Sequence, residues 1–448
     1  MTQQPTTSPP QARRRPHILL IGGGLVGLTT AWRLQRELRA GDADVTLVNP
    51  QNYMVYQSLL PEVASGMLEP TDVVVPLRRT LQRTRIVVGR LTGLDTHRRV
   101  ATVEPIEADA REIPYDHIVL ALGSDTKMLP VPGLAEHAVG FTTVPEALFL
   151  RDHVLSRLEA AAHSTDDEAR RRALTFVFVG GGYSGVEALG ELQAMAYAAS
   201  RLYPTISPRD QHWVLIEATG RILPMVDETL ADNATRALER RGVDVRLETT
   251  MDSAEDGVLR LSDGDELRAG TLVWAAGVAP SPLLADLGVP LNDTGAVEVD
   301  GTLRVKGIDG VWAAGDCAAV PDLVDGGTCP PSAQYALREA RQLASNLAAS
   351  VRGEQPEQFR YNQRGEMLTL GHHNGVAQIF DRHLHGVLPW YLRRMYHVGR
   401  VPSVRRKVQV WADWTLRLLL GRDVVSLGSL RRPGAPLEDA AESQFRAS

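Results

Sequence analysis

Residues 17–34 read HILLIGGGLVGLTTAWRL, and residues 175–192 read TFVFVGGGYSGVEALGEL. In each stretch an apolar run predicts a buried parallel strand, and a helical pattern follows it. Both turns have the spacing G-x-G-x-x-G, which falls on Gly22, Gly24, Gly27 and on Gly180, Gly182, Gly185. Such a turn lets the backbone approach a pyrophosphate, and the helix N-terminus supplies N–H donors to it. Two copies predict two bound dinucleotides and therefore electron transfer between them.

The composition is that of an ordinary globular protein. The chain has 448 residues, which predicts two or three domains, with 44% hydrophobic and 23% charged residues. No apolar run reaches the roughly 20 residues that a membrane-spanning helix needs. Residues 1–16 lack the apolar core of a signal peptide and resemble a transit peptide only faintly, so we expect a disordered tail there.

Cysteine and histidine patterns do not indicate a metal site. The two cysteines, Cys317 and Cys329, form no CxxC motif, which disfavours both a disulfide scaffold and a cysteine zinc site. Two histidine patterns, His372-His373 and His383-x-His385, have metal-like spacing, but no cluster of acids or cysteines accompanies them. We expect these histidines to be packed or exposed side chains, and Cys317 to be a packed small residue.

Strand and helix signals alternate from residue 17 to about residue 345, which predicts an α/β fold with parallel sheets. The stretch GVWAAGDCAAV (310–320) reads as a strand whose partners lie in the first domain, so the second domain is expected to be inserted in the first. The predicted organisation is a tail (1–16), a first Rossmann-like domain (17–143 and 284–355), an inserted second one (144–283) and a C-terminal region (356–448).

The end of the second strand of each Rossmann unit predicts a contact to the adenosine ribose. In the second unit this residue is Glu217, whose carboxylate accepts from both ribose hydroxyls and repels a 2′-phosphate, which favours NADH over NADPH. Arg221, four residues on, weakens that preference. In the first unit the position holds Asn49, an uncharged amide that still bonds a hydroxyl.

Positive charge is concentrated near the C-terminus. The chain has a formal net charge of −6, yet residues 382–432 hold eleven Lys and Arg against Asp413 and Asp423, so this segment is +9 and the remainder −15. The asymmetry predicts a surface for an anionic partner. Nucleic acid is disfavoured because no nucleic-acid module surrounds the segment and the isoelectric point is about 6.1.

Apolar residues follow helical spacing within that segment, at Val404, Val408, Trp411, Thr415, Leu418 and Leu419. Basic residues lie elsewhere around the wheel, and Val410, Trp414 and Leu420 widen the stripe. Basic amphipathic helices with aromatic anchors lie in lipid interfaces. We therefore predict a membrane-surface helix; a domain or dimer interface with a solvated charged face is the alternative.

The motifs IGGGLVGL, YQSLLPEVASG, ALGS, VGGGYSGVE, AAGDCA and PPSAQYALREA together resemble the two-dinucleotide flavoprotein oxidoreductases. Within them the chain resembles the type II NADH dehydrogenases, single-subunit NADH:quinone oxidoreductases that do not pump protons, over roughly residues 15–430. The resemblance implies FAD as cofactor in the first domain, NADH as co-substrate in the second and a membrane quinone as acceptor. It also implies a peripheral location at the cytoplasmic face of the cell membrane and, by analogy, a homodimer.

The resemblance also implies roles for particular residues. The FAD site would comprise the first glycine turn with Asn49, Leu60 and Pro61 along the flavin, Leu91 near the adenine, and Ala121, Gly123, Gly315, Asp316 and Ala333. The NADH site would comprise the second glycine turn with Glu217, Ala276 and Gly277. Glu187 matches a family acid near the nicotinamide, and Gln334 lies in the family's quinone motif AQxxxQ; these two are the candidate catalytic residues.

The chain departs from AQxxxQ at its last position, where Arg338 replaces the second glutamine. One helical turn from Gln334, a cation changes the polarity of the proposed quinone mouth. It stabilises a quinone oxygen or an anionic semiquinone, or it indicates another acceptor. Two alternatives therefore stay open: a soluble NAD(P)H-dependent flavoprotein reductase with a different acceptor, and a slow FAD- and NADH-binding redox sensor.

Overall fold

The computed structural model describes residues 15–362, 365–380, 382–401, 404–422 and 424–426. All but the last two residues of the predicted N-terminal tail lie outside the described residues. The chain forms two compact units. Unit 1 comprises the described parts of Met1–Met54, Pro76–Asp125 and Ala279–Asn362, and unit 2 those of Val55–Val75, Thr126–Val278 and Gln363–Ser448.

Unit 1 is built on a seven-stranded sheet in the order β19-β8-β1-β2-β5-β6-β7. The first five strands run parallel, and β6 and β7 are antiparallel additions. Because β19 pairs with β8, the expectation that strand 310–320 joins the first sheet is confirmed. The strands are β1 (His17–Ile21), β2 (Asp44–Asn49), β5 (Arg85–Asp95), β6 (Val100–Pro105), β7 (Arg111–Pro114), β8 (His117–Leu120) and β19 (Val311–Ala313).

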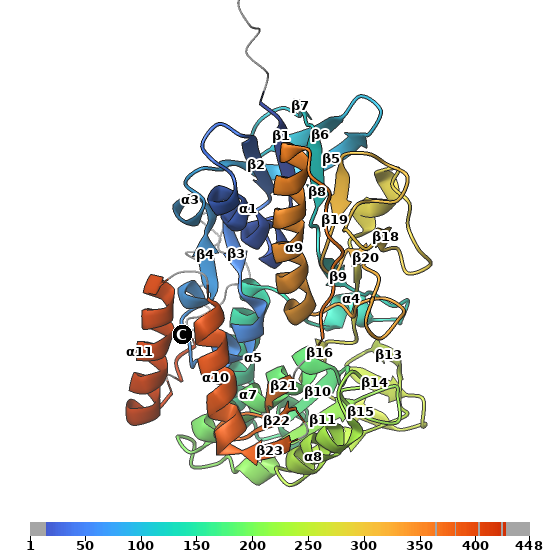
Figure 1. Ribbon diagram of the computed structural model, residues 1–448. Helices are drawn as coiled ribbons and strands as arrows, with labels where there is room; N and C mark the ends of the chain where they lie inside the picture. The colour runs from blue at the N-terminus through green and yellow to red at the C-terminus, as the bar shows by residue number, and fades with distance from the viewer. Residues whose placement is uncertain (1–14, 363–364, 381, 402–403, 423, 427–448) are drawn as a thin grey trace, which may run out of the picture. The chain divides into compact units, whose positions relative to one another are not determined.

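Two long helices of unit 1, α1 (Leu25–Glu37) and α9 (Ala333–Arg352), lie side by side (Figure 1). The Thr30 hydroxyl donates to the Ala340 carbonyl at 3.3 Å between them. Helix α9 begins where the Ser332 hydroxyl accepts from the Tyr335 N–H and ends at Gly353, whose φ of 77° suits only glycine without strain. The smaller elements of unit 1 are α3 (Leu77–Thr80), η4 (Pro282–Asp286), β18 (Val297–Glu298) and β20 (Ala318–Ala319).

Unit 2 contains a four-stranded parallel sheet in the order β12-β11-β10-β16. Every residue of β10 is buried, as the continuous apolar run predicts for a central parallel strand. Phe176 stacks on Trp213 of the neighbouring strand with ring centroids 4.3 Å apart. The strands are β10 (Thr175–Val179), β11 (His212–Ile216), β12 (Val243–Arg246) and β16 (Thr271–Trp274).

Helices and two antiparallel sheets complete the central part of unit 2. The sheets consist of β13 (Met251–Glu255), β14 (Val258–Leu261) and β15 (Glu266–Arg268), and of β21 (Gly365–Thr369), β22 (Gly375–Ile379) and β23 (Arg382–Gly386). The helices are η1 (Gln57–Leu59), α2 (Leu60–Ala64), η2 (Pro70–Val73), α4 (Leu134–His137), α5 (Val144–His163), α6 (Asp167–Ala173), α7 (Tyr183–Ser200), η3 (Pro208–Asp210) and α8 (Glu228–Glu239). Strands β3 (Tyr53–Val55), β4 (Val74–Pro76), β9 (Ser124–Thr126) and β17 (Val278–Pro280) lie where the chain passes from one unit to the other.

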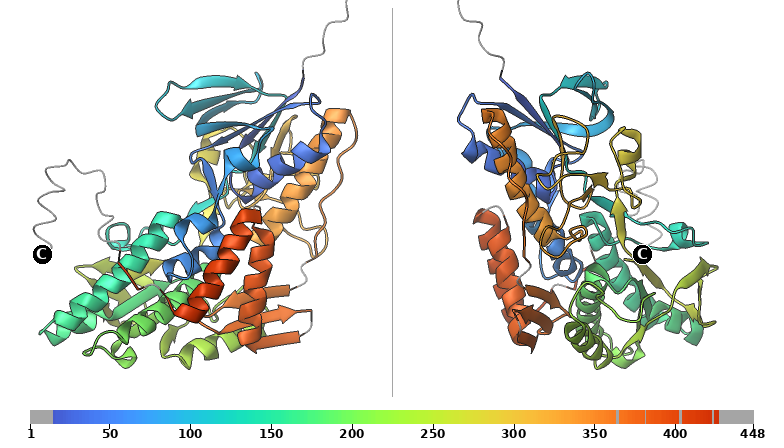
Figure 2. Two further views of the ribbon diagram at one scale, coloured as in Figure 1. Left: turned by 90° about the vertical axis from the view of Figure 1, so that its left-hand side faces the viewer. Right: turned by 45° about the vertical axis from the view of Figure 1, so that its right-hand side comes forward.

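The C-terminal part of unit 2 forms two helices, α10 (Val387–Arg400) and α11 (Val404–Leu420) (Figure 2). Helix α10 packs on β21 and β22. The predicted helix from Val404 is confirmed, and the apolar positions of its expected stripe, among them Val404, Val408 and Leu419, lie on the exposed side. Val410 and Trp414 are buried, whereas Trp411 is exposed, because the helix has one apolar face toward unit 2 and another toward solvent. Among the described residues, no helix combines the length and apolar character needed to span a membrane.

Candidate functional site

The two glycine turns have the same local geometry. Gly22 has φ 102° and Gly180 has φ 112°, and each donates its N–H to the end of the second strand, at 2.9 Å and 2.8 Å. A Cβ on Gly27 would lie 1.8 Å from the Gly22 carbonyl oxygen, and one on Gly185 would lie 2.0 Å from that of Gly180. The third glycine of each turn is therefore required by the packing of the turn on itself.

The middle glycine of each motif faces open space. A Cβ on Gly24 or on Gly182 would have no protein atom within 4 Å. Both residues are helix N-caps without a side-chain cap, so the first N–H groups of α1 and α7 have no cap from that residue's side chain. An open, donor-bearing turn of this kind accommodates a pyrophosphate, and two such turns fit two dinucleotides.

Asn49 and Glu217 accept equivalent hydrogen bonds in the two units. The Gly23 N–H donates to Asn49 Oδ1 at 2.7 Å, and the Gly181 N–H donates to Glu217 Oε2, also at 2.7 Å. The second oxygen of Glu217 accepts from the Thr219 N–H and hydroxyl, each at 2.8 Å. The Asn49 amide thus accepts the same hydrogen bond from the glycine turn that the Glu217 carboxylate accepts in unit 2. An uncharged amide in place of an acid therefore preserves this contact in unit 1.

The other candidate FAD residues of unit 1 surround the same end of the sheet. Ala121 follows β8, and its carbonyl would lie 2.1 Å from a Cβ on Gly22, so the two backbones are in close approach. Gly123, two residues on, has φ 69° and open space around it. Leu91 is buried on β5. Leu60 and Pro61, in contrast, are buried residues of α2 in unit 2.

The AAGD turn is held by a buried acid that the sequence did not single out. The Gly315 N–H donates to Glu339 Oε2 of α9 at 2.6 Å, and the Ser124 hydroxyl donates to Asp316 at 3.0 Å. Burial raises the pKa of Asp316 and raises that of Glu339 to about 7. The first contact fixes the Gly315 backbone, and the second fixes the carboxylate of Asp316, the residue proposed to bind the ribitol chain.

The first turn of α9 carries Ala333 and Gln334. Ala333 is exposed and Gln334 is half-buried. Arg338 donates from Nη1 to the Gln334 main-chain carbonyl at 2.8 Å, and the Tyr361 hydroxyl donates to Gln334 Oε1 at 3.3 Å. The side chain of Arg338, at the last position of AQxxxQ, is therefore bonded to the main chain of Gln334.

In unit 2, Ala276 and Gly277 follow β16, with Gly277 at φ 96°. Glu187 lies in the first half of α7, directly after the second glycine turn, and is buried. The structure places these residues, Glu217 and the second turn in the same unit.

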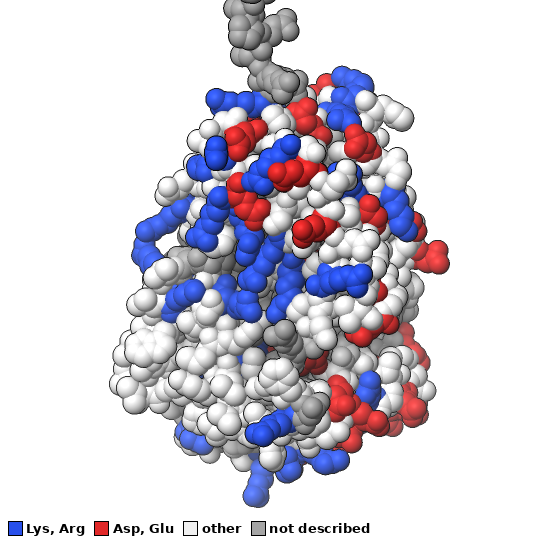
Figure 3. Space-filling view, viewed as in Figure 1, with Lys and Arg blue, Asp and Glu red and all other residues white. Residues whose placement is uncertain are grey.

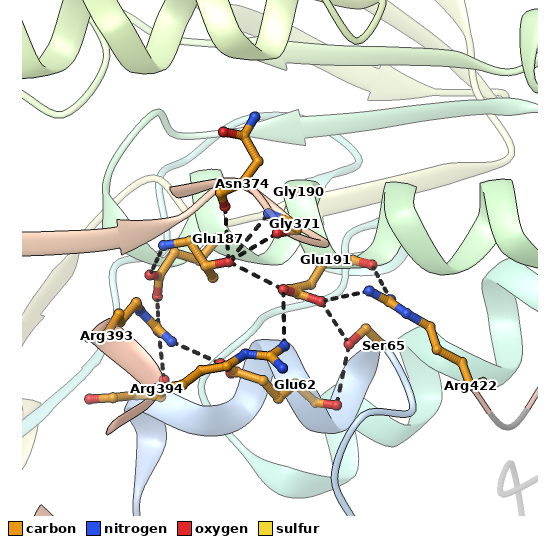
Figure 4. A network of polar contacts seen from close by, with 12 residues as sticks. Glu62, Ser65, Glu187, Gly190, Glu191, Gly371, Asn374, Arg393, Arg394 and Arg422 are labelled. Atoms are coloured by element: carbon orange, nitrogen blue, oxygen red, sulfur yellow. Dashed lines mark hydrogen bonds and ion pairs between the residues drawn. The ribbon is translucent and has the colours of Figure 1, made fainter. Parts of the chain in front are cut away.

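Glu187 belongs to a buried network of ion pairs (Figure 4). Arg393 of α10 lies between two carboxylates, with Nη2 2.6 Å from Glu187 Oε2 and Nη1 2.8 Å from Glu62 Oε1. The Thr369 N–H donates to Glu187 Oε1 at 2.9 Å. Glu62 is 0% exposed and Arg393 1% exposed, so this pairing is shielded from solvent.

Glu191, one helical turn after Glu187, anchors a second group of arginines. Arg422 Nη2 lies 3.3 Å and Arg394 4.0 Å from its carboxylate, and the Ser65 hydroxyl donates to it at 3.1 Å. The Arg394 guanidinium also lies 4.0 Å from the ring of Trp390 and 4.9 Å from that of Trp414. The contact with Trp414 joins α10 to α11, whereas that with Trp390 lies within α10.

The two acids on α7 have different protonation properties. Burial raises the pKa of Glu187 to about 7, against the opposing effects of Arg393 and the Thr369 N–H. Burial acts in the same direction on Glu191, but Arg422 and Arg394 outweigh it and lower the pKa of that carboxyl. Glu187 therefore takes up and releases a proton near neutral pH, while Glu191 stays ionised.

The interpretation of residues 382–432 as a basic surface is wrong for five of its arginines. Each forms an ion pair within unit 2: Arg393 with Glu62 and Glu187, Arg394 and Arg422 with Glu191, Arg406 with Asp72, and Arg417 with Glu69. Their charge balances acids from earlier parts of the chain, so it is not available in full to an anionic partner.

The residues that sequence reasoning missed are Glu62, Glu191, Glu339, Arg393 and Tyr361. The adjacent pair Arg393–Arg394 inside an apolar helix was the one available signal for the network, since cations rarely occupy such positions without buried partners. Cys317 is buried, as expected, and burial raises the pKa of its thiol to about 11. Within the described ranges, no group of three or more His, Cys, Asp or Glu side chains is arranged to bind a metal.

Comparisons with known proteins agree with this geometry. The sequence profile of the pyridine nucleotide-disulphide oxidoreductase family matches residues 16–340. The chain is 30% identical over 422 residues to the type II NADH:quinone oxidoreductase NdhA of Mycobacterium tuberculosis, covering 90% of this chain and 87% of that protein. It is 29% identical over 435 residues to Ndh of the same organism, covering 94% and 91%.

The fold has a similar counterpart among solved structures. NDH2 from Plasmodium falciparum in complex with NADH superposes with a TM-score of 0.85 at 19% identity, covering 92% of this chain and 100% of that one. This structural similarity shows the fold alone, whereas the profile match and the mycobacterial sequences show the family. By these comparisons the chain belongs to the pyridine nucleotide-disulphide oxidoreductase family and, within it, to the type II NADH:quinone oxidoreductases.

Proposed function

We propose that the protein is an FAD-dependent NADH:quinone oxidoreductase that passes electrons from NADH through the flavin to a membrane quinone without pumping protons. The observation that carries the proposal is the pair of open glycine turns, at Gly24 and Gly182, each with space where a pyrophosphate would lie. The membership of the chain in a family of NADH:quinone oxidoreductases supports the choice of donor and acceptor.

The residues of unit 1 fit FAD. The turn at Gly22, Gly24 and Gly27 would hold the pyrophosphate, Asn49 the ribose and Asp316 the ribitol chain. Leu91, Ala121, Gly123, Gly315 and Ala333 complete the proposed set in unit 1, and Leu60 and Pro61, proposed to lie along the flavin, belong to unit 2. Bound flavin would supply the redox chemistry, and the protein contributes binding, orientation and local charge.

The residues of unit 2 fit NADH. The turn at Gly180, Gly182 and Gly185 would hold its pyrophosphate, and Glu217 its adenosine ribose. Ala276 and Gly277 would lie beside it. The carboxylate of Glu217, fixed by Gly181 and Thr219, would repel a 2′-phosphate and so favours NADH over NADPH.

Glu187 is the proposed acid of the reaction, since a quinone takes up protons as well as electrons. With a pKa raised to about 7, its carboxyl holds a proton at neutral pH in a large fraction of molecules. Arg393 and the Thr369 N–H fix both carboxyl oxygens. Gln334 is proposed to orient the acceptor.

The membrane is proposed to be contacted by α10 and α11, at the cytoplasmic face. The surface over these helices is mostly uncharged in the view of Figure 3. The apolar side chains of α11 that are more than half exposed are Val404, Val408, Trp411, Leu416, Leu419 and Leu420. Exposed apolar residues clustered on one helix face are typical of peripheral attachment to a bilayer.

Anaerobic mixing with NADH, followed by a short-chain quinone, tests the function. We expect purified yellow protein to lose flavin absorbance with NADH and to recover it promptly with quinone. Gly182→Asp is the matched control, because its new carboxylate enters open space in the second turn and repels a pyrophosphate. This variant should stay yellow with NADH and bleach with dithionite.

Other outcomes separate the alternatives. Absence of bound flavin would overturn the proposal. Bleaching without recovery would favour a reductase with another acceptor, for which Arg338 is the specific structural reason. Slow recovery with every acceptor would favour the redox sensor.

A further inference from the structure

Gln334, Arg338 and Tyr361 contact one another at the first turns of α9. The Arg338 guanidinium carbon lies 4.0 Å from the centroid of the Tyr361 ring, and its Nη1 donates to the Gln334 carbonyl at 2.8 Å. The Tyr361 hydroxyl donates to Gln334 Oε1 at 3.3 Å. One tyrosine thus contacts both the cation that replaces the family's second glutamine and the amide of the first.

The fold holds Tyr361 at this place. After α9 the chain turns back along the helix, where the Asn346 side chain exchanges two hydrogen bonds with the Glu357 main chain, both at 2.9 Å. The Phe359 N–H then donates to the Gly301 carbonyl at 2.7 Å. The Tyr335 ring meets that of Tyr361 edge-on, with centroids 5.0 Å apart. The tyrosine is therefore positioned by the backbone on one side and by an aromatic ring on the other.

Positive charge accumulates beside Gln334. Within the part of the chain that the structure describes, no carboxylate forms an ion pair with Arg338. Gln334 is the second residue of α9, so the positive end of the helix dipole also lies beside it. The loop acid Asp322 accepts from the Val324 and Asp325 N–H groups, at 2.8 Å and 3.1 Å, so these hydrogen bonds go to its own loop and not to Arg338.

We propose that Arg338 makes the acceptor site selective for acidic quinones, whose ring hydroxyl is ionised at neutral pH, over neutral quinones of the same size. Arg338 is the specificity-determining residue, and Tyr361 is a positioning residue that sets both the guanidinium and the Gln334 amide. The inference rests on the proposed function, since it concerns the quinone of that same reaction. The attraction between a guanidinium and an anionic oxygen persists in a half-buried site, where a single charge changes affinity about tenfold.

Two naphthoquinones of equal ring size test the proposal: 2-hydroxy-1,4-naphthoquinone, which is anionic at neutral pH, and neutral 2-methyl-1,4-naphthoquinone. The measured quantity is the ratio of their kcat/KM values, compared between variants because the two compounds differ in intrinsic reactivity. R338Q, which restores the glutamine of the motif, should lower the ratio about tenfold, through KM of the acidic quinone. R352Q, at the other end of α9, is the matched control and should leave the ratio unchanged.

Tyr361 variants separate positioning from charge. Y361F keeps the ring beside the guanidinium but removes the hydroxyl that donates to Gln334. KM should therefore rise for both quinones, while the ratio of their kcat/KM values stays unchanged. Y361A removes the ring as well and should lower the ratio, and high salt should lower it in the unmodified protein. Flavin content and bleaching by NADH establish that each variant is folded.

A ratio that stays within about twofold in R338Q, against the tenfold change expected from one charge, would overturn the inference. Turnover of the neutral quinone in the same assay would leave the proposed function standing in that case. Failure of both quinones to reoxidise the reduced protein would instead remove the proposed function, and this inference with it.

Discussion

Arg393 Nη2 lies 2.6 Å from Glu187 Oε2, and the same guanidinium reaches Glu62 Oε1 at 2.8 Å. All three side chains are buried. A guanidinium suits this position because its planar fork donates in two directions at once, whereas an ammonium is a single point charge. One cation of α10 therefore pairs with two carboxylates from other parts of unit 2.

Replacing Arg393 by Met should destabilise the protein by about 3–5 kcal/mol, because two buried carboxylates lose their counter-charge. The free energy of unfolding from urea titration measures this change. Arg405 is exposed on α11, and R405M should change the stability by less than about 0.5 kcal/mol. Equal effects of the two substitutions would contradict the role given to the network.

The stability of the protein should depend on pH through Glu187. Its pKa is raised from 4.5 to about 7 by burial, so between these values the folded state binds more protons than the unfolded state. The contribution of Glu187 to the free energy of unfolding is fully present below pH 4.5. It is lost as the pH rises from 4.5 through about 7, by at most about 1.4 kcal/mol per pH unit. The difference in unfolding free energy between the unmodified protein and Glu187→Gln should follow this course; a difference independent of pH would refute it.

Gly24 and Gly27 should respond differently to alanine. In G27A the new methyl would meet the Gly22 carbonyl at 1.8 Å, so the turn must open and the thermal midpoint should fall by several degrees. In G24A the methyl meets no protein atom, so the fold should hold while less FAD is retained. Thermal unfolding and the flavin-to-protein absorbance ratio distinguish these outcomes. Normal flavin content in G24A would remove Gly24 from the proposed site.

Glu339 should be replaceable by Gln and not by Leu. The Gly315 N–H needs a buried acceptor, which a glutamine carbonyl supplies and a leucine does not. We expect E339L to lose about 1–3 kcal/mol of stability and to release flavin faster on dialysis. Since burial raises the pKa of Glu339 to about 7, E339Q should also weaken the pH dependence of stability, without loss of flavin. Faster flavin release from E339Q would argue against this assignment.

Attachment to lipid should depend on the exposed apolar face of α11. The double variant W411S/L419S should bind anionic vesicles at least about tenfold more weakly, because each large apolar side chain contributes roughly 1.5–3 kcal/mol on burial. L202S/M225S removes exposed apolar residues elsewhere in unit 2 and is the control. Co-sedimentation measures both. Because five arginines of the segment are ion-paired, we expect binding to survive moderate salt.

The sequence predicted the parallel strands and both glycine turns because their signals are local: continuous apolar runs, and glycines at fixed spacing. It also predicted the helix from Val404. It did not predict which side of that helix is buried, since Val410 and Val408 are equally apolar and only the packing distinguishes them.

The ion-pair network was beyond local pattern reasoning. Glu187 and Arg393 are 206 residues apart, and no periodicity connects them. The family resemblance implies a role for Glu187, whereas the charge pattern alone predicts a surface position for its partner Arg393. The individual FAD and NADH contacts, the domain limits and the homodimer stay predictions.

The same network has a consequence for biosynthesis. Glu62 precedes Arg393 by 331 residues, so at about 5–20 residues per second the ribosome delivers the cation roughly 15 to 70 s after the acid. Throughout that interval Glu62, joined 125 residues later by Glu187, lacks the counter-charge of Arg393, and the buried network of unit 2 stays incomplete. The core of unit 2 is therefore completed only when α10, which carries Arg393, has been translated.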